Sequence, residues 1–335
     1  AQRGEGVQVS MSGEGSESLA TDDSNLVVQA VHALAQHAQI DPHVSIHVDK
    51  SIPLAGGMAG GSADAAGTLV ACAALWGTGL SREELADIGA RLGSDVPFAL
   101  FGANAIGRGR GEQIMPVLGR GQFHWVFALA DEGLSTPAVY RQCDTLRAGE
   151  QIRPPEVFDA LLHALRQGDA KALAAALHND LQPAAISLRP SLRSLLEAGV
   201  EYGALAGVVS GSGPTCAFLC RDSAHSIDVA VAMTATGMCR TVKRATGPAP
   251  GAPAADFGVR PCAVEAGVSS RACRPACPLV GVRSPDLEGG QSLCIAAGTA
   301  AAMADPTDGA RGRREARAVR SAASCRSISE SAAAP

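Results

Sequence analysis

The chain has 335 residues, of which 46% are hydrophobic, and a formal net charge of −5. That length accommodates two domains of ordinary size, and the composition suggests neither a nucleic-acid-binding protein nor a disordered acidic one. No stretch reaches the roughly 18 consecutive apolar residues of a membrane span, so we predict a cytoplasmic protein without a membrane partner.

The first elements are predicted from capping residues and periodicity. Thr21–Asn25 supplies capping side chains before a helical pattern from Leu26 to Ala38. Val44, Ile46 and Val48 then alternate with polar residues, which predicts a half-buried strand running toward Pro53.

A glycine-rich segment, Pro53-Leu-Ala-Gly-Gly-Met-Ala-Gly-Gly-Ser-Ala63, follows that strand and leads into an alanine-rich helix that we expect to begin near Gly61 or Ser62. Such a loop points backbone amides and a helix N-terminus at one place, which is an anion site and most simply a phosphate site. A tight turn alone would need only one or two of these glycines. The loop lacks the Gly-Lys-Ser/Thr ending of the Walker A motif, which disfavours that nucleotide-binding fold.

Ser81-Arg-Glu-Glu84 matches a capping box and predicts the next helix, closed by Gly93. The apolar run 123–131 predicts a buried strand that opens a second unit. Helical patterns follow near 156–166, 170–179 and 190–198, then strands on either side of residues 210–215, a helix at 224–236 and a strand at 238–245. This order predicts an α+β sandwich.

Two carboxylates near the glycine-rich segment are candidate functional groups. Asp95, in Leu92-Gly-Ser-Asp-Val-Pro-Phe98, would orient or deprotonate an acceptor hydroxyl, or would only cap the segment that follows it. Asp64 would meet Mg²⁺ or would only complement the helix dipole. The cluster Ser210-Gly-Ser-Gly-Pro-Thr215 is, from its residues alone, a hairpin turn.

Taken in order, these segments resemble motifs of the GHMP kinases. Pro53–Ala66 is similar to their ATP-binding motif and Gly207–Thr215 to their third motif. The variant Gly-Gly-Met-Ala-Gly-Gly-Ser-Ala-Asp-Ala-Ala, followed by Leu-Gly-Ser-Asp-Val-Pro-Phe, resembles the diphosphocytidyl-methylerythritol kinases, especially those of actinobacteria, over about residues 7–252.

The resemblance implies transfer of the ATP γ-phosphoryl group, with Mg²⁺, to the 2-hydroxyl of 4-diphosphocytidyl-2-C-methyl-D-erythritol in the non-mevalonate isoprenoid pathway. The alternatives are another GHMP kinase, of the homoserine or mevalonate type, and an inactive nucleotide-binding remnant. The resemblance makes Asp95 catalytic, Ser135, Thr136 and Tyr140 substrate-binding, and Gly211, Ser212 and Gly213 an active-site loop; metal ligands stay unassigned. The ATP-binding residues that it implies are Pro53, Leu54, Ala55, Gly56, Gly57, Met58, Ala59, Gly60, Gly61, Ser62 and Ala63.

The implied fold has a ribosomal-protein-S5-like domain at residues 1–121 and a ferredoxin-like domain at 122–247, as a monomer or homodimer. The family's first strand carries an Asn and a catalytic Lys, whereas the first lysine here is Lys50, which we interpret as misplaced for that role. We therefore expect the first strands to be missing and activity to be a small fraction of a full-length enzyme's. Residues 248–335, arginine-rich and poor in aromatic residues, are expected to be a linker and a disordered tail of aberrant sequence.

Overall fold

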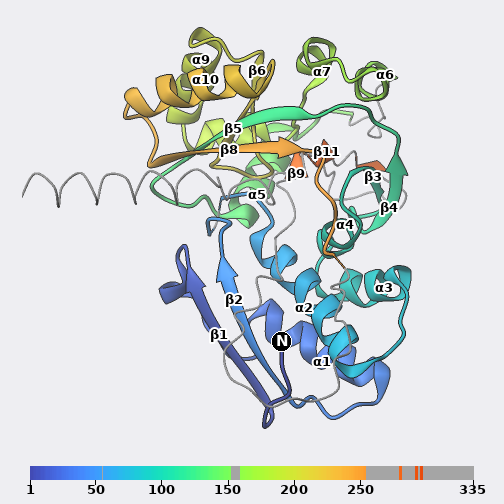
Figure 1. Cartoon of the computed structure of the whole chain (residues 1–335). Helices are drawn as coiled ribbons and strands as arrows, with labels where there is room; N and C mark the ends of the chain where they lie inside the picture. The colour runs from blue at the N-terminus through green and yellow to red at the C-terminus, as the bar shows by residue number, and fades with distance from the viewer. Residues whose placement is uncertain (55, 152–158, 254–278, 281–290, 293–294, 297–335) are drawn as a thin grey trace, which may run out of the picture.

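The structure is a computed structural model that describes residues 1–54, 56–151, 159–253, 279–280, 291–292 and 295–296. Its elements form an N-terminal unit and a C-terminal unit, joined between strands β4 (Gln113–Val117) and β5 (Phe123–Leu129) (Figure 1). The mixture of helices and strands expected from the sequence is confirmed. Most of the predicted tail lies outside the described residues, so that prediction is not addressed.

The N-terminal unit is built on two parallel strands, β1 (Val7–Gly13) and β2 (Val44–Lys50), paired from Val7 opposite Val44 to Gly13 opposite Lys50. Helix α1 (Leu26–Ala38) is capped by the Asn25 side chain, as the sequence predicts. The remaining elements are α2 (Gly60–Trp76), α3 (Arg82–Leu92), α4 (Val96–Phe101), β3 (Asn104–Arg108) and β4 (Gln113–Val117).

The C-terminal unit is a four-stranded antiparallel sheet in the order β6-β7-β5-β8. Its strands are β5 (Phe123–Leu129), β6 (Ala206–Val209), β7 (Cys216–Cys220) and β8 (Thr241–Gly247). Helices lie between β5 and β6 and between β7 and β8, which gives the β-α-β-β-α-β order of ferredoxin-like folds. These helices are α5 (Thr136–Leu146), α6 (Asp159–Gln167), α7 (Ala170–Ala176), α8 (Gln182–Leu188), α9 (Ser191–Glu201) and α10 (Ser223–Ala235).

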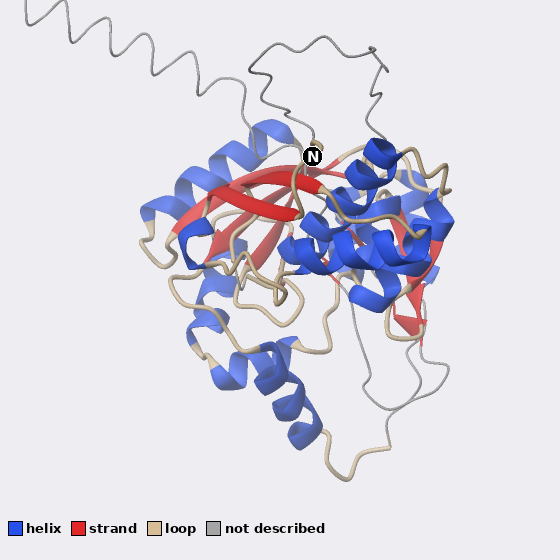
Figure 2. Ribbon diagram, turned by 90° about the horizontal axis from the view of Figure 1, so that it is seen from below, coloured by secondary structure: helices blue, strands red, loops and turns tan. Residues whose placement is uncertain are grey.

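The two faces of this sheet belong to different hydrophobic clusters. On strand β5, Phe123, Trp125 and Phe127 join the core of the N-terminal unit, whereas Val126 and Ala128 face a second cluster with α5, α8, α9 and α10. Figure 1 shows β5 and β8 with α9 and α10 on one side and the N-terminal unit on the other, and Figure 2 shows the mixture of helices and strands by colour. The two units therefore share one buried core across their boundary.

The segment expected to begin a linker returns to the N-terminal unit. The Ala103 amide donates to the Ala249 carbonyl at 2.7 Å, and the Ala252 amide donates to the Ala99 carbonyl at 2.9 Å. Ala249 and Ala252 are buried. Beyond this segment lie three two-residue strands, β9 (Leu279–Val280), β10 (Gln291–Ser292) and β11 (Ile295–Ala296).

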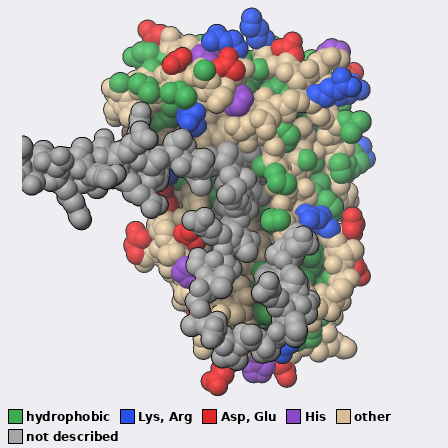
Figure 3. All heavy atoms as spheres, in the orientation of Figure 1, with side chains coloured by type: hydrophobic (Ala, Val, Ile, Leu, Met, Phe, Trp, Pro, Cys, Tyr) green, Lys and Arg blue, Asp and Glu red, His purple; other side chains and the backbone are tan. Residues whose placement is uncertain are grey.

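No helix of the described residues is long and apolar enough to cross a membrane. On the face drawn in Figure 3, acidic and basic side chains are interspersed rather than gathered into a patch of one sign.

Candidate active site

The glycine-rich segment connects β2 to α2 at the place where the two units meet (Figure 1). Its backbone has positive φ at Gly57 (φ 68°) and at Ala59 (φ 51°), which turns the chain into the helix. Helix α2 begins at Gly60, one residue before the predicted start. Because first-turn amides have no acceptor within their own helix, those of Gly60, Gly61 and Ser62 are available to an anion.

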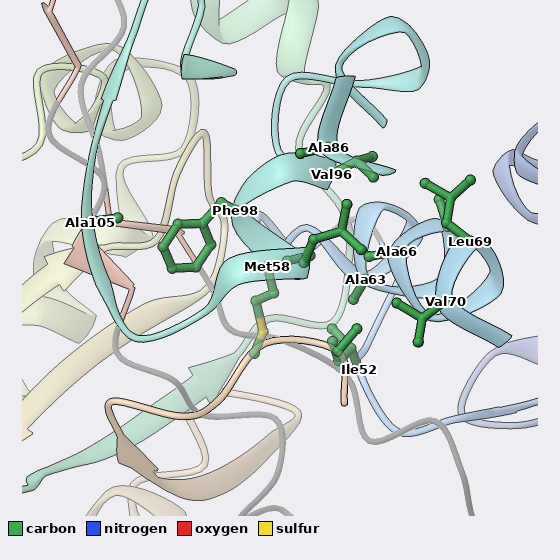
Figure 4. Close-up of a cluster of buried hydrophobic side chains, with 14 of the residues drawn as sticks. Ile52, Met58, Ala63, Ala66, Leu69, Val70, Ala86, Val96, Phe98 and Ala105 are labelled. Atoms are coloured by element: carbon green, nitrogen blue, oxygen red, sulfur yellow. The ribbon is translucent and has the colours of Figure 1, made fainter. Parts of the chain in front are cut away.

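Several side chains of this segment point into the protein instead. Met58 is 2% exposed and lies with Ile52, Val96 and Phe98 in one apolar cluster (Figure 4). Pro53 and Ala63 are also buried. These residues would contribute their backbone, and not their side chains, to a ligand. Ala55, which was predicted with them, lies outside the described residues.

The loop between β6 and β7 rests directly on the glycine-rich segment. The Ser210 hydroxyl donates to the Gly57 carbonyl at 3.0 Å. A Cβ added at Gly57 would collide with the Ser210 carbonyl oxygen and would lie 3.0 Å from the Gly213 amide nitrogen. The structure therefore brings the predicted loop residues Gly211, Ser212 and Gly213 to the predicted ATP loop.

The predicted substrate residues divide into two groups. The Thr136 hydroxyl lies 2.8 Å from the Ser212 hydroxyl, which joins the start of α5 to the same loop. Ser135 is exposed at the N-cap position of α5. Tyr140 lies one turn further along and packs half-buried against the second hydrophobic cluster. The Thr136–Ser212 contact thus ties the start of α5 to the loop.

Asp95 lies at the N-cap position of α4, as the alternative interpretation predicts, but its side chain accepts no capping hydrogen bond. It is half-buried. Its segment adjoins the start of α2, because a Cβ added at Gly93 would lie 3.9 Å from the Ser62 hydroxyl oxygen. The structure therefore places the Asp95 segment beside the first turn of the helix that follows the glycine-rich segment.

A buried ion pair braces the same helix. The Lys50 ammonium, at the end of β2, donates to the Asp64 carboxylate in the second turn of α2. Their side chains are 1% and 12% exposed, respectively. Burial raises the pKa of Asp64 above its usual value, and the Lys50 charge opposes that rise. This pairing accounts for Asp64 without a metal ion.

From the sequence, Lys50 was interpreted only as misplaced for the role of the family's catalytic lysine. Its signal was nevertheless present, because the alternation of buried Val44, Ile46 and Val48 continues in register to Lys50. A lysine at a core-facing strand position calls for a buried carboxylate partner.

The described residues contain no group of three or more His, Cys, Asp or Glu side chains that could hold a metal ion. Mg²⁺ is commonly bound through one or two carboxylates together with substrate phosphates, so it does not require such a group.

Comparisons with known proteins agree with this arrangement. Residues 25–103 match the GHMP kinases N terminal domain, and residues 161–237 match the GHMP kinases C terminal model. The chain is 57% identical to a 4-diphosphocytidyl-2-C-methyl-D-erythritol kinase of Salinispora arenicola, over 75% of this chain and 81% of that protein. It is 56% identical to the kinase of that name from Rhodococcus jostii, over 74% and 80% of the two chains.

Solved structures show the same fold. A crystal structure of 4-(cytidine 5'-diphospho)-2C-methyl-D-erythritol kinase matches with a TM-score of 0.59 and 27% identity, over 73% of this chain and 83% of that one. Homoserine kinase from Cytophaga hutchinsonii matches with a TM-score of 0.58 and 17% identity, over 72% and 81% of the two chains, which shows the fold alone.

The sequence identity over most of the length of these relatives, together with the two domain matches in order, shows that the chain belongs to the family of 4-diphosphocytidyl-2-C-methyl-D-erythritol kinases.

Proposed function

We propose that this chain transfers the γ-phosphoryl group of ATP to the 2-hydroxyl of 4-diphosphocytidyl-2-C-methyl-D-erythritol. The observation that carries the proposal is the meeting of three segments at the start of α2: the glycine-rich segment, the Ser210–Gly213 loop and the Asp95 segment. Phosphoryl transfer depends mainly on positioning and on electrostatic stabilisation, and these segments supply both.

In this proposal the amides of Gly60, Gly61 and Ser62 bind the phosphates of ATP at the N-terminus of α2. The backbone at Gly57 supports these amides, because the Ser210 hydroxyl donates a hydrogen bond to the Gly57 carbonyl. The absence of a Cβ at Gly57 allows this close backbone approach.

The proposed chemical step forms a bond between the acceptor oxygen and the γ-phosphorus and breaks the bond from that phosphorus to the β,γ-bridging oxygen, so that ADP leaves. Asp95 accepts the proton of the acceptor hydroxyl. Thr136, which lies against the Ser210–Gly213 loop, contacts the acceptor. Tyr140 is retained as the aromatic contact for cytosine, on the family resemblance alone.

Mg²⁺ supplies neutralisation of the charge on the β- and γ-phosphates when it is bound. Asp64 is a poor ligand for it because its carboxylate already accepts from Lys50. The candidate protein ligand is the Ser62 hydroxyl, in the first turn of α2.

Replacement of Asp95 by Asn tests the proposed proton acceptor. The variant keeps the size of the side chain and removes its basicity, so we expect turnover to fall by about 10²- to 10⁴-fold. The affinity for ATP, measured by isothermal titration calorimetry, should stay within about threefold of the wild type because the helix amides are untouched.

Asp87→Asn is the matched control, since Asp87 is an exposed carboxylate on the neighbouring helix α3. It should retain full turnover. Wild-type turnover by Asp95→Asn would exclude a role for Asp95 in proton transfer.

A further inference from the structure

The turn between α7 and α8 carries a buried asparagine that reaches the active-site loop. Asn179 is 3% exposed. Its side-chain amide donates to the Val209 carbonyl at 2.7 Å and to the Gly211 carbonyl at 2.8 Å, and its carbonyl accepts from the Leu181 amide at 2.9 Å. Both donor hydrogens and the acceptor oxygen of this side chain are thus in use.

The two carbonyls that Asn179 binds lie on either side of Ser210. Holding both at one point fixes the backbone through Ser210, whose hydroxyl then donates to the Gly57 carbonyl at 3.0 Å. Two backbone hydrogen bonds within the loop, from Ser210 to Thr215 and from Gly213 to Ser210, are each 2.8 Å long. Asn179 thereby joins the α7–α8 turn to the glycine-rich segment through a single intervening residue.

The turn that carries Asn179 is itself anchored. Asp180 pairs with Arg147 at 3.1 Å and lies 2.6 Å from the His178 ring nitrogen. The Gln182 side chain accepts from the Val209 amide at 2.9 Å. These contacts fix the backbone on the C-terminal side of Asn179, so its side chain is preorganised. A phosphate-binding loop needs such support, because its amides must keep one orientation toward the ligand.

We infer that Asn179 is a positioning residue for the ATP site: through the Val209 and Gly211 carbonyls it holds Ser210 against Gly57. The inference rests on the proposed ATP binding at the start of α2. It assigns Asn179 no contact with the nucleotide. Its effect passes through the loop, and it predicts that loss of the amide donors loosens the loop and weakens nucleotide binding together.

Asn179→Asp is the sharpest test, because it keeps the side-chain shape and replaces two N–H donors by a carboxylate oxygen facing two carbonyls. We expect amide hydrogen exchange in residues 209–213 to become about tenfold faster. The dissociation constant for ATP with Mg²⁺ should rise about tenfold, because buried carbonyls lose their donors. Exchange in α10 should not change.

The pH dependence separates positioning from general destabilisation. Burial raises the pKa of a carboxyl, so an aspartate at this position would take up a proton as the pH falls from about 8 to about 5. The protonated carboxyl donates again to one carbonyl. The defect in ATP affinity, relative to the wild type at each pH, should therefore shrink at the lower pH.

Gln142→Glu is the matched control. Gln142 is half-buried on α5 and donates to the Ser187 hydroxyl at 3.0 Å, so the variant makes the same chemical change in the same unit, away from the loop. Its loop exchange and ATP affinity should equal those of the wild type. If Asn179→Asp does not fold, the same measurements are made on Asn179→Ala, which adds no charge.

A folded Asn179 variant with wild-type loop exchange and wild-type ATP affinity would overturn the inference. Faster loop exchange with unchanged ATP affinity would overturn it as well. A wild-type chain that binds ATP but does not phosphorylate 4-diphosphocytidyl-2-C-methyl-D-erythritol would contradict the proposed function and leave this inference standing, since neither readout uses the acceptor.

Discussion

Lys50 and Asp64 place opposite charges inside the protein where β2 reaches the glycine-rich segment. A Cβ added at Gly60 would lie 3.6 Å from the Lys50 nitrogen, so the ammonium is adjacent to the first turn of α2. Removing one partner of a buried ion pair is costly because the other charge stays buried and unpaired. The pair therefore ties the strand before the segment to the helix after it.

Lys50→Met should lower the free energy of unfolding by about 3–5 kcal/mol near neutral pH. Without the lysine, burial alone acts on Asp64 and raises its pKa further. A carboxyl with a raised folded-state pKa binds its proton more tightly in the folded state, so stability falls as the pH rises above the unfolded-state pKa of about 4.

Urea unfolding of Lys50→Met at about pH 5 and about pH 8 measures this effect. The penalty should be larger at the higher pH. The double variant Lys50→Met/Asp64→Leu should recover most of the lost stability, because an apolar pair of similar volume replaces the ion pair. An equal penalty at both pH values would contradict the assignment.

At the residue scale, sequence reasoning was strongest where a residue acts through its backbone. The glycines predict a helix N-terminus whatever surrounds them, and α2 begins within one residue of the prediction. The sequence did not reveal the structural roles of Lys50, Asp64 and Asn179, because each role depends on a partner elsewhere in the chain. Lys50 pairs with Asp64, and Asn179 donates to carbonyls 30 and 32 residues later. The role of Asp95 stays a prediction.

At the element scale, the strongest local signals gave the most accurate boundaries. The capping box of α3 is present in full, with Ser81 and Glu84 bonded to each other's backbone amides. Helix α10 spans Ser223–Ala235, against a predicted 224–236. Strand β8 begins at Thr241, three residues after the predicted start. Strands β1, β3 and β4 and helices α5 and α8 were not predicted. Strands β3 and β4 have five residues each, which is too short for a clear period. Strand β1 does alternate Val7, Val9 and Met11 with polar residues, so its signal was present but not recognised.

The contact between the glycine-rich segment and the Ser210–Gly213 loop can be tested with Gly57→Ala. The substitution adds a Cβ that would collide with the Ser210 carbonyl, at a residue whose φ is 68°. We expect ATP affinity to fall by at least about tenfold, since a forced separation moves the amides that follow. Isothermal titration calorimetry measures the affinity.

Gly77→Ala is its control, because Gly77 has a similar φ of 64° and an added Cβ there would meet nothing within 4 Å. Both variants carry the backbone strain of a left-handed alanine, about 1–2 kcal/mol. Only Gly57→Ala also breaks the contact. Equal ATP affinities for the two variants would show that strain, and not the contact, governs the site.

At the scale of the whole molecule, the proposed active site depends on both units. The glycine-rich segment and Asp95 come from the N-terminal unit, whereas Ser210–Gly213, Thr136 and Asn179 come from the C-terminal unit. One face of the C-terminal sheet joins the N-terminal core, so the relative placement of the units is set by buried apolar contacts. The two-unit organisation was visible in the order of patterns, but the shared core was not, because it joins residues far apart in sequence.

The chain also returns to the N-terminal unit at Ala249 and Ala252, after the last strand of the C-terminal sheet. Composition alone made Pro248–Pro253 a boundary, yet its backbone pairs with that of Ala99 and Ala103. Close approach there requires small residues, since a Cβ added at Gly251 would collide with the Leu100 carbonyl oxygen. Proline and glycine in this segment thus accompany a packed contact.

The most direct test of the proposed function is acceptor-dependent phosphoryl transfer by the full chain. The chain would be incubated with ATP, Mg²⁺ and, separately, 4-diphosphocytidyl-2-C-methyl-D-erythritol, homoserine or mevalonate, with ADP release and the ³¹P NMR spectrum as readouts. We predict ADP release only with the first acceptor, together with a new phosphomonoester on its 2-hydroxyl. ADP release with homoserine or mevalonate, or none with any acceptor, would contradict the account.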